Sequence, residues 1–188
     1  MQYRDTRDAT TEPKLTADAA ARARRVKMVL MDVDGVLTDG RIVFCGPTDE
    51  TKFFDSQDGV GVRLAIRAGL KIGLITGRAS QALGRRASEL GITEIYMNSS
   101  DKGGAYRQVL AASRYEDADI AFIGDDLVDM PVMKRAGFAA AVPNAVPEVI
   151  RAAHFVASRP GGRGAVRQIL DFIMKVQGTW ARATRGYV

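Results

Sequence analysis

The chain has 188 residues, a hydrophobic content of 46%, a formal net charge of +5, one cysteine and one histidine. This length suits one domain with its own core, and the lone Cys45 excludes a disulfide framework and suits a reducing cytoplasm. Because His154 is the only histidine, a His-rich zinc site is excluded. Any catalysis must therefore rest mainly on carboxylates, Lys, Arg, hydroxyls and a metal.

The sequence also limits the partners that we expect. No apolar run reaches the roughly 18 residues of a membrane span, and the N-terminus lacks the apolar core of a signal peptide. The basic residues are not interleaved with aromatic ones, and no nucleic-acid-binding motif occurs. We therefore expect a cytoplasmic protein with no membrane segment and no nucleic-acid partner, whose positive charge favours small anionic substrates.

In chain order, residues 1–24 show little core pattern and predict a mobile N-terminal tail. Residues 26–31 form a short apolar run that is typical of a buried parallel strand. Residues 41–45 and 51–55 flank a turn-forming cluster at 46–50 and predict a β-hairpin.

Beyond the hairpin, helical and strand patterns alternate. Predicted strands cover residues 71–75, 94–97, 119–123, 138–142 and 155–157, and predicted helices cover 58–67, 80–90, 102–113, 127–136, 145–153 and 165–177. Such alternation indicates an α/β protein with a three-layer, Rossmann-like parallel sheet that helices cover on both faces. We expect one domain over residues 25–178, a C-terminal tail at 179–188, a small hairpin insertion and no cap domain.

Two carboxylates, Asp32 and Asp34, follow the first predicted strand, and Gly35 comes next. Ligands bind at the carboxyl ends of strands in open α/β sheets. Clustered carboxylates repel each other unless one holds a proton or a cation lies between them. Mg²⁺ is the cation that suits such hard oxygen ligands. A solvated acidic turn is the alternative interpretation of this motif on its own.

Further polar groups follow three other predicted strands: Thr76, Gly77 and Arg78 after the first, Lys102 after the second, and Asp125, Asp126 and Asp129 after the third. Each of these motifs alone also fits a turn or a helix cap. A parallel sheet, however, brings all of them to one edge. The combination of carboxylates, a hydroxyl, an ammonium and a guanidinium predicts a site for Mg²⁺ and a phosphoryl group.

The order Asp-x-Asp-Gly-x-Leu-Thr, Ile-Thr-Gly-Arg, Lys and Gly-Asp-Asp-x-x-Asp resembles the haloacid dehalogenase superfamily of phosphatases over residues 26–177. The motif at residues 161–167, Gly-Gly-Arg-Gly-Ala-Val-Arg, is similar to the branch that acts on eight-carbon and nine-carbon acidic sugar phosphates. The resemblance implies the fold of that superfamily and a Mg²⁺-dependent phosphatase of lipopolysaccharide precursor synthesis.

The resemblance also implies roles for individual residues. Asp32 would be the nucleophile that forms an aspartyl-phosphate, and Asp34 would be the general acid and base. Asp32, the Asp34 carbonyl and Asp125 would bind Mg²⁺. The remaining roles are metal support by Asp126 or Asp129, and contacts to phosphate or substrate by Thr76, Gly77, Arg78, Lys102, Arg163 and Arg167.

Asp55, Gln57 and Gln168 depart from the residues usual in that branch, which are Asn, Arg and Glu. The exact sugar is therefore left open, with a nine-carbon sialic-acid-type sugar phosphate or another phosphoester as alternatives. A non-enzymatic phospho-acceptor module also uses an acidic cluster, a Thr and a Lys. Its acceptor Asp, however, lies on a middle strand, apart from the acidic pair.

The short segments between the motifs leave no room for a cap domain, so a small substrate would be poorly shielded from water. The predicted hairpin carries the apolar residues Ile42, Phe44 and Phe53, and an isolated hairpin is marginally stable in water. We therefore expect a homo-oligomer, in particular a homotetramer, in which a neighbouring chain completes the site. The alternative is an uncapped monomer that acts on a macromolecule.

Overall fold

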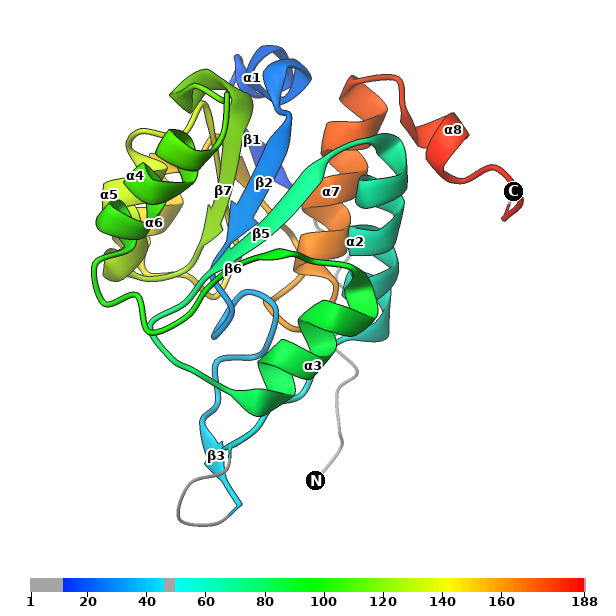
Figure 1. Cartoon of the computed structure of the whole chain (residues 1–188). Coiled ribbons are helices and arrows are strands. Elements are labelled where there is room, and N and C mark those ends of the chain that lie inside the picture. The colour runs from blue at the N-terminus through cyan, green and yellow to red at the C-terminus, as the bar shows by residue number, and fades with distance from the viewer. Residues whose placement is uncertain (1–11, 46–49, 188) are drawn as a thin grey trace, which may run out of the picture.

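A seven-stranded sheet forms the middle layer of the protein (Figure 1). The computed structural model describes residues 12–45 and 50–187. Along the sheet the strands are β1 (Lys14–Leu15), β9 (Phe155–Val156), β8 (Phe138–Ala141), β7 (Ile120–Gly124), β2 (Met28–Met31), β5 (Lys71–Ile75) and β6 (Glu94–Tyr96). Neighbouring strands are parallel except for β1, which pairs antiparallel with β9.

Helices cover both faces of this sheet, as Figure 1 shows. On one side lie α1 (Ala19–Arg25), α2 (Ser56–Ala68), α7 (Ala165–Val176) and α8 (Trp180–Ala183); on the other lie α4 (Lys102–Ala112), α5 (Met130–Met133) and α6 (Pro147–Ala152); α3 (Gln81–Leu90) connects β5 to β6. The central strands β2 and β7 are buried along their whole length, as expected when both faces are covered. The predicted α/β fold class is confirmed.

A separate two-stranded hairpin projects from the body beside α3 (Figure 1). Its strands, β3 (Val43–Phe44) and β4 (Glu50–Thr51), are antiparallel, with Val43 opposite Thr51. In the described part of the chain, this hairpin and α2 are the only elements between β2 and β5, in agreement with the predicted small insertion. Among the described helices, none is long and apolar enough to cross a membrane.

The N-terminal boundary differs from the sequence-based expectation. Residues 1–11 fall outside the described residues, but β1 adds a strand to the sheet edge, and Thr16 N donates to His154 O at 2.9 Å. Helix α1 buries Ala19 and Ala23 completely. Small alanine side chains produce only a weak apolar pattern, so the sequence did not reveal this packing.

The C-terminal boundary also differs. Helix α8 extends the chain past residue 178, and its Ala183 is fully buried. Arg182 Nη2 donates to Ala68 O at 2.8 Å, which attaches this segment to the end of α2. The folded body therefore extends beyond both predicted boundaries.

Candidate active site

The strand order places three predicted motifs side by side. Strand β2 lies between β7 and β5, with Met31 opposite both Ile123 and Leu74. Asp32 continues this register, because its N–H donates to Ile123 O at 3.0 Å. The segments that follow the three strands therefore leave the sheet together at its carboxyl edge, where open α/β sheets bind ligands.

Lys102 joins Asp32 at this edge. It opens helix α4, is 4% exposed, and places Nζ 2.8 Å from Asp32 Oδ1 and 2.7 Å from Asp129 Oδ1. Burial disfavours the ammonium, but the two carboxylates outweigh burial and raise the pKa of Lys102. Lys102 is therefore a fixed positive charge beside the predicted nucleophile.

Asp32, Asp125 and Asp129 form an acidic cluster in which each offers an oxygen within 4.8 Å of the others. Burial raises the pKa of Asp32 to about 6, with the neighbouring Asp129 adding to the shift. Burial, followed by Asp32 and Asp129, raises the pKa of Asp125 to about 7. The cluster therefore carries more negative charge than Lys102 alone offsets.

These residues fit a divalent metal. Asp125 Oδ1 is buried and has no hydrogen-bond partner among the described residues. A side chain on Gly35 would place its Cβ 2.0 Å from Asp125 Oδ2, so only glycine leaves room for this carboxylate. A hard cation with oxygen ligands would satisfy the free oxygen and offset the excess charge.

Asp129 and Asp126 have different roles in this arrangement. Both oxygens of the fully buried Asp129 are occupied, because Oδ1 contacts Lys102 and Oδ2 accepts from the N–H groups of Asp125 at 2.9 Å and Asp126 at 3.2 Å. The Asp126 side chain instead turns back to accept from Leu127 N at 2.7 Å. Asp32 and Asp125 thus remain to hold a metal, and Asp129 orients both Lys102 and the Asp125 loop.

The Asp34 carboxylate does not join the acidic cluster. Its Oδ1 contacts the ammonium of Lys52, which lies beside the hairpin strand β4. Lys52 also lies 3.4 Å from Glu50 Oε2, and Glu50 Oε1 pairs with Arg78. Neither Lys52 nor Glu50 is predicted from the sequence to belong to the site. The one signal available was a lysine within an apolar strand pattern, which usually indicates an exposed side chain.

Thr76 and the turn after it have the predicted location. Thr76 is 1% exposed, and its Oγ1 accepts from Arg78 N at 3.2 Å. Gly77 is exposed in the turn between them. The Nε of Arg78 is buried and has no hydrogen-bond partner among the described residues, so this guanidinium can still receive an anionic group.

The glycine-rich segment braces the loop that follows Asp32. A Cβ on Gly161 would lie 1.7 Å from Gly35 O, and Gly162 N donates to Val36 O at 2.9 Å. Asn144 joins the two segments, because its Nδ2 donates to Gly35 O at 3.1 Å and its Oδ1 accepts from Gly161 N at 2.8 Å. The glycines are thus needed for close backbone contact. Arg163, which follows them, is exposed.

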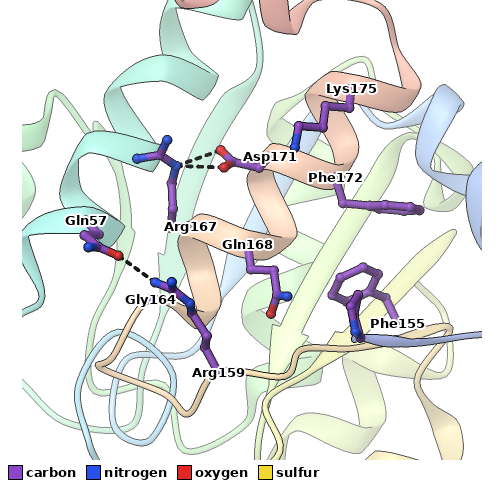
Figure 2. A pocket seen from close by; sticks show the side chains of 10 residues that line it. Gln57, Phe155, Arg159, Gly164, Arg167, Gln168, Asp171, Phe172 and Lys175 are labelled. Atoms are coloured by element: carbon purple, nitrogen blue, oxygen red, sulfur yellow. Dashed lines mark hydrogen bonds and ion pairs between the residues drawn. The ribbon is translucent and has the colours of Figure 1, made fainter. Parts of the chain in front are cut away.

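Arg167 is not brought to the acidic cluster within one chain. Its Nε donates to Asp171 Oδ1 at 2.8 Å, and its guanidinium lies 5.7 Å from the centre of the Trp180 ring. As Figure 2 shows, it lines a different pocket, of about 570 Å³, along α7. Its predicted contact with substrate therefore stays a prediction.

The same pocket contains two of the three departures from the usual motif residues (Figure 2). Gln57 accepts from Arg159 Nη1 at 2.6 Å, and Gln168 Oε1 accepts from Ser158 N at 2.8 Å. Both amides are thus engaged by the segment at residues 158–159, which precedes α7. Neither amide forms a hydrogen bond to the acidic cluster among the described residues.

The parallel sheet with its carboxylates, lysine and threonine at one edge defines a haloacid dehalogenase-like hydrolase. The sequence profile of the haloacid dehalogenase-like hydrolase family matches residues 75–169. The chain is 41% identical over 167 residues to 3-deoxy-D-manno-octulosonate 8-phosphate (Kdo 8-phosphate) phosphatase of Yersinia pestis, with 89% of each chain covered. The chain belongs to the family of Kdo 8-phosphate phosphatases.

Solved structures agree with this assignment. The Kdo 8-phosphate phosphatase of Moraxella catarrhalis, in complex with magnesium ion, phosphate ion and Kdo, superposes with a TM-score of 0.88 at 34% identity, covering 92% of this chain and 100% of that one. A haloacid dehalogenase superfamily hydrolase (subfamily III A) of Legionella pneumophila gives a TM-score of 0.87 at 38% identity, covering 90% and 93%.

Proposed function

We propose that this protein is a Mg²⁺-dependent phosphomonoesterase that hydrolyses Kdo 8-phosphate to Kdo and inorganic phosphate. The observation that carries the proposal is the buried Asp32, which contacts Lys102 and lies within 4.8 Å of Asp125, whose Oδ1 has no described partner. The family, and the Moraxella relative with magnesium, phosphate and Kdo, support the choice of metal and sugar.

In the first half of the proposed reaction, Asp32 attacks the phosphorus and forms an aspartyl-phosphate as the bond to the sugar oxygen breaks. Asp34 gives its proton to that oxygen. The Lys102 ammonium offsets the charge of the phosphoryl oxygens, and the Thr76 hydroxyl donates a hydrogen bond to them. A Mg²⁺ ion held by Asp32, the Asp34 carbonyl and Asp125 would supply further positive charge at the same oxygens.

In the second half, water attacks the phosphorus of the aspartyl-phosphate, and Asp34 takes the proton that the water loses. Phosphate leaves, and Asp32 is regenerated as a carboxylate. Asp34 then holds the proton for the next turnover. The same side chain thus acts as acid and then as base.

The sugar portion requires groups beyond the acidic cluster. Arg78 follows β5 next to Thr76, and its buried Nε without a described partner makes it our first choice for an acidic group of the substrate. Arg163 is exposed beside Gly161 and Gly162, the glycines that contact the loop after Asp32. We propose that it also contacts substrate, and that Arg167 does so only in an assembly.

We also propose that the protein is a cytoplasmic homotetramer in which a neighbouring chain completes the site. The support is the hairpin, whose Ile42, Phe44 and Phe53 are 48%, 70% and 66% exposed in one chain. Apolar side chains gathered on a projecting two-stranded hairpin favour an interface between copies of the chain. The exposed free thiol of Cys45 suits the reducing cytoplasm.

The test is a comparison of kcat/KM for Kdo 8-phosphate, a nine-carbon acidic sugar phosphate, a neutral hexose phosphate and p-nitrophenyl phosphate, each with and without Mg²⁺. We expect Kdo 8-phosphate to have the highest value. A higher value for the nine-carbon sugar would reassign the substrate. A complete lack of phosphate release from all four substrates would reject the proposal that the protein is a phosphomonoesterase.

A further inference from the structure

Each carboxylate of the Asp-x-Asp motif has its own buried lysine. Asp32 pairs with Lys102 from α4, and Asp34 pairs with Lys52 from the segment after β4. The side chain of Lys52 is 3% exposed, against 4% for that of Lys102. Buried lysines are rare unless they are paired, so the burial of a second one beside Asp34 points to a defined role.

Lys52 is part of a chain of alternating charges that runs from Asp34 to the turn after β5. The ammonium contacts Asp34 on one side and Glu50 on the other, and Glu50 in turn contacts Arg78. The Glu50 side chain is 11% exposed, so solvent screens these charges weakly. Asp34 is thereby held toward the hairpin, apart from the cluster of Asp32, Asp125 and Asp129.

We propose that Lys52 is a positioning residue for Asp34. This inference rests on the proposed function, in which Asp34 must face the leaving oxygen and later the attacking water. The hydrogen bond from Lys52 holds one carboxylate oxygen of Asp34, which leaves the other oxygen for proton transfer. It also keeps the Asp34 carboxylate away from the metal, which a freely rotating side chain two residues from Asp32 could reach, while the backbone carbonyl of Asp34 stays available as a metal ligand.

The experiment compares Lys52→Met, which keeps the apolar stem, with Lys52→Arg, which keeps the charge. Lys27→Met is the matched control, because Lys27 pairs with Asp119 at 3.1 Å but is 61% exposed at the opposite end of β2. All are assayed on Kdo 8-phosphate and on p-nitrophenyl phosphate, whose leaving group needs no proton. The aryl ester tests Lys52 even if the sugar assignment fails.

For Kdo 8-phosphate we expect Lys52→Met to lower kcat roughly 10²-fold, which is in the range of general acid–base catalysis, with little change in KM. On p-nitrophenyl phosphate the first turnover should survive while breakdown of the aspartyl-phosphate slows. The nitrophenolate should therefore appear as a burst of about one per site before a slow steady state. Lys52→Arg should restore part of kcat, and Lys27→Met should match the wild type.

Two further results decide between positioning and a merely structural role. In an Asp34→Asn background, Lys52→Met should cause a much smaller additional loss than in the wild type, because it acts through Asp34. If Lys52→Met fails to fold, Lys52→Arg is examined for the same burst. The proposal would be overturned if Lys52→Met kept the wild-type kcat or changed only KM. It would also be overturned if kcat fell without a burst on p-nitrophenyl phosphate, or if the losses from Lys52→Met and Asp34→Asn multiplied in the double variant.

Discussion

Replacing Asp58 by Asn should change how the stability of this protein depends on pH. Asp58 is fully buried at the start of α2, and its two oxygens accept from Arg167 N at 2.7 Å and Gly164 N at 3.1 Å. It thereby caps the first turn of α7 from a neighbouring helix. Helix α7 directly follows the glycine-rich segment that contacts the loop after Asp32. The Asp58 cap therefore also supports the active site.

The size of the effect follows from the pKa of Asp58. Burial raises this pKa from 3.8 to about 6, although the N–H groups of Arg167 and Gly164 act against the rise. The folded protein therefore binds more protons than the unfolded chain between these values. The contribution of this carboxyl to the stability of the folded protein is fully present below pH 3.8 and is lost as the pH rises through about 6. A shift of about two units corresponds to about 3 kcal/mol.

Asn at this position does not titrate. Its NH₂ group would face one of the two backbone N–H groups, which costs roughly 1–3 kcal/mol at every pH. The deficit of the variant relative to the wild type should therefore shrink by about 2 kcal/mol between about pH 4.5 and about pH 7.5.

The assay is urea unfolding of both proteins across this pH range, at one protein concentration and with a chelator present. Asp101→Asn, which makes the same chemical change at the exposed cap of α4, is the control. A deficit of Asp58→Asn that stays constant, or that grows as the pH rises, would refute the reasoning.

Three further predictions concern activity and assembly. Asp32→Asn should abolish phosphate release without lowering the melting temperature, because an amide is a poor nucleophile and background hydrolysis is very slow; near wild-type turnover in a phosphate assay would reject the assignment. Excess chelator should remove activity and added Mg²⁺ should restore it, since oxygen ligands select hard divalent ions; full activity of metal-stripped protein would contradict this. The double variant Phe44→Ser, Phe53→Ser should shift the mass measured by light scattering toward the 20.3 kDa of one chain and should lower turnover of the sugar phosphate. The control Ile66→Ser, on α2, should change neither quantity, and an unchanged mass of the double variant would argue against the hairpin interface.

The sequence by itself was sufficient for the fold class and for most of the catalytic edge. Apolar runs of strand length alternated with helical patterns, and each parallel strand between residues 26 and 125 was followed by a distinct polar motif. Both signals are local, and parallel strand ends must meet at one edge. Asp32, Thr76, Lys102 and Asp125 could therefore be predicted together, and the structure places all four at that edge.

Tertiary structure decided which of the neighbouring carboxylates belong to the cluster. Asp126 and Asp129 are equivalent in the motif, yet a 3₁₀ turn at Leu127–Asp129 buries Asp129 and directs Asp126 back to Leu127 N. Asp32 and Asp34 likewise separate, one toward Lys102 and one toward Lys52. The direction of a side chain depends on local backbone geometry and on packing partners that the spacing of the motif does not specify.

Contacts between distant parts of the chain were also decided only by the fold. Lys52 reaches Asp34 because the hairpin folds back, Gly161 touches Gly35 across 126 positions of sequence, and Asp58 caps a helix that begins at Ala165. The alanines of α1 and the strand β1 became part of the body in the same way. Periodicity and turn signals report on a few neighbouring residues, whereas these pairings depend on the free energy of packing the whole chain.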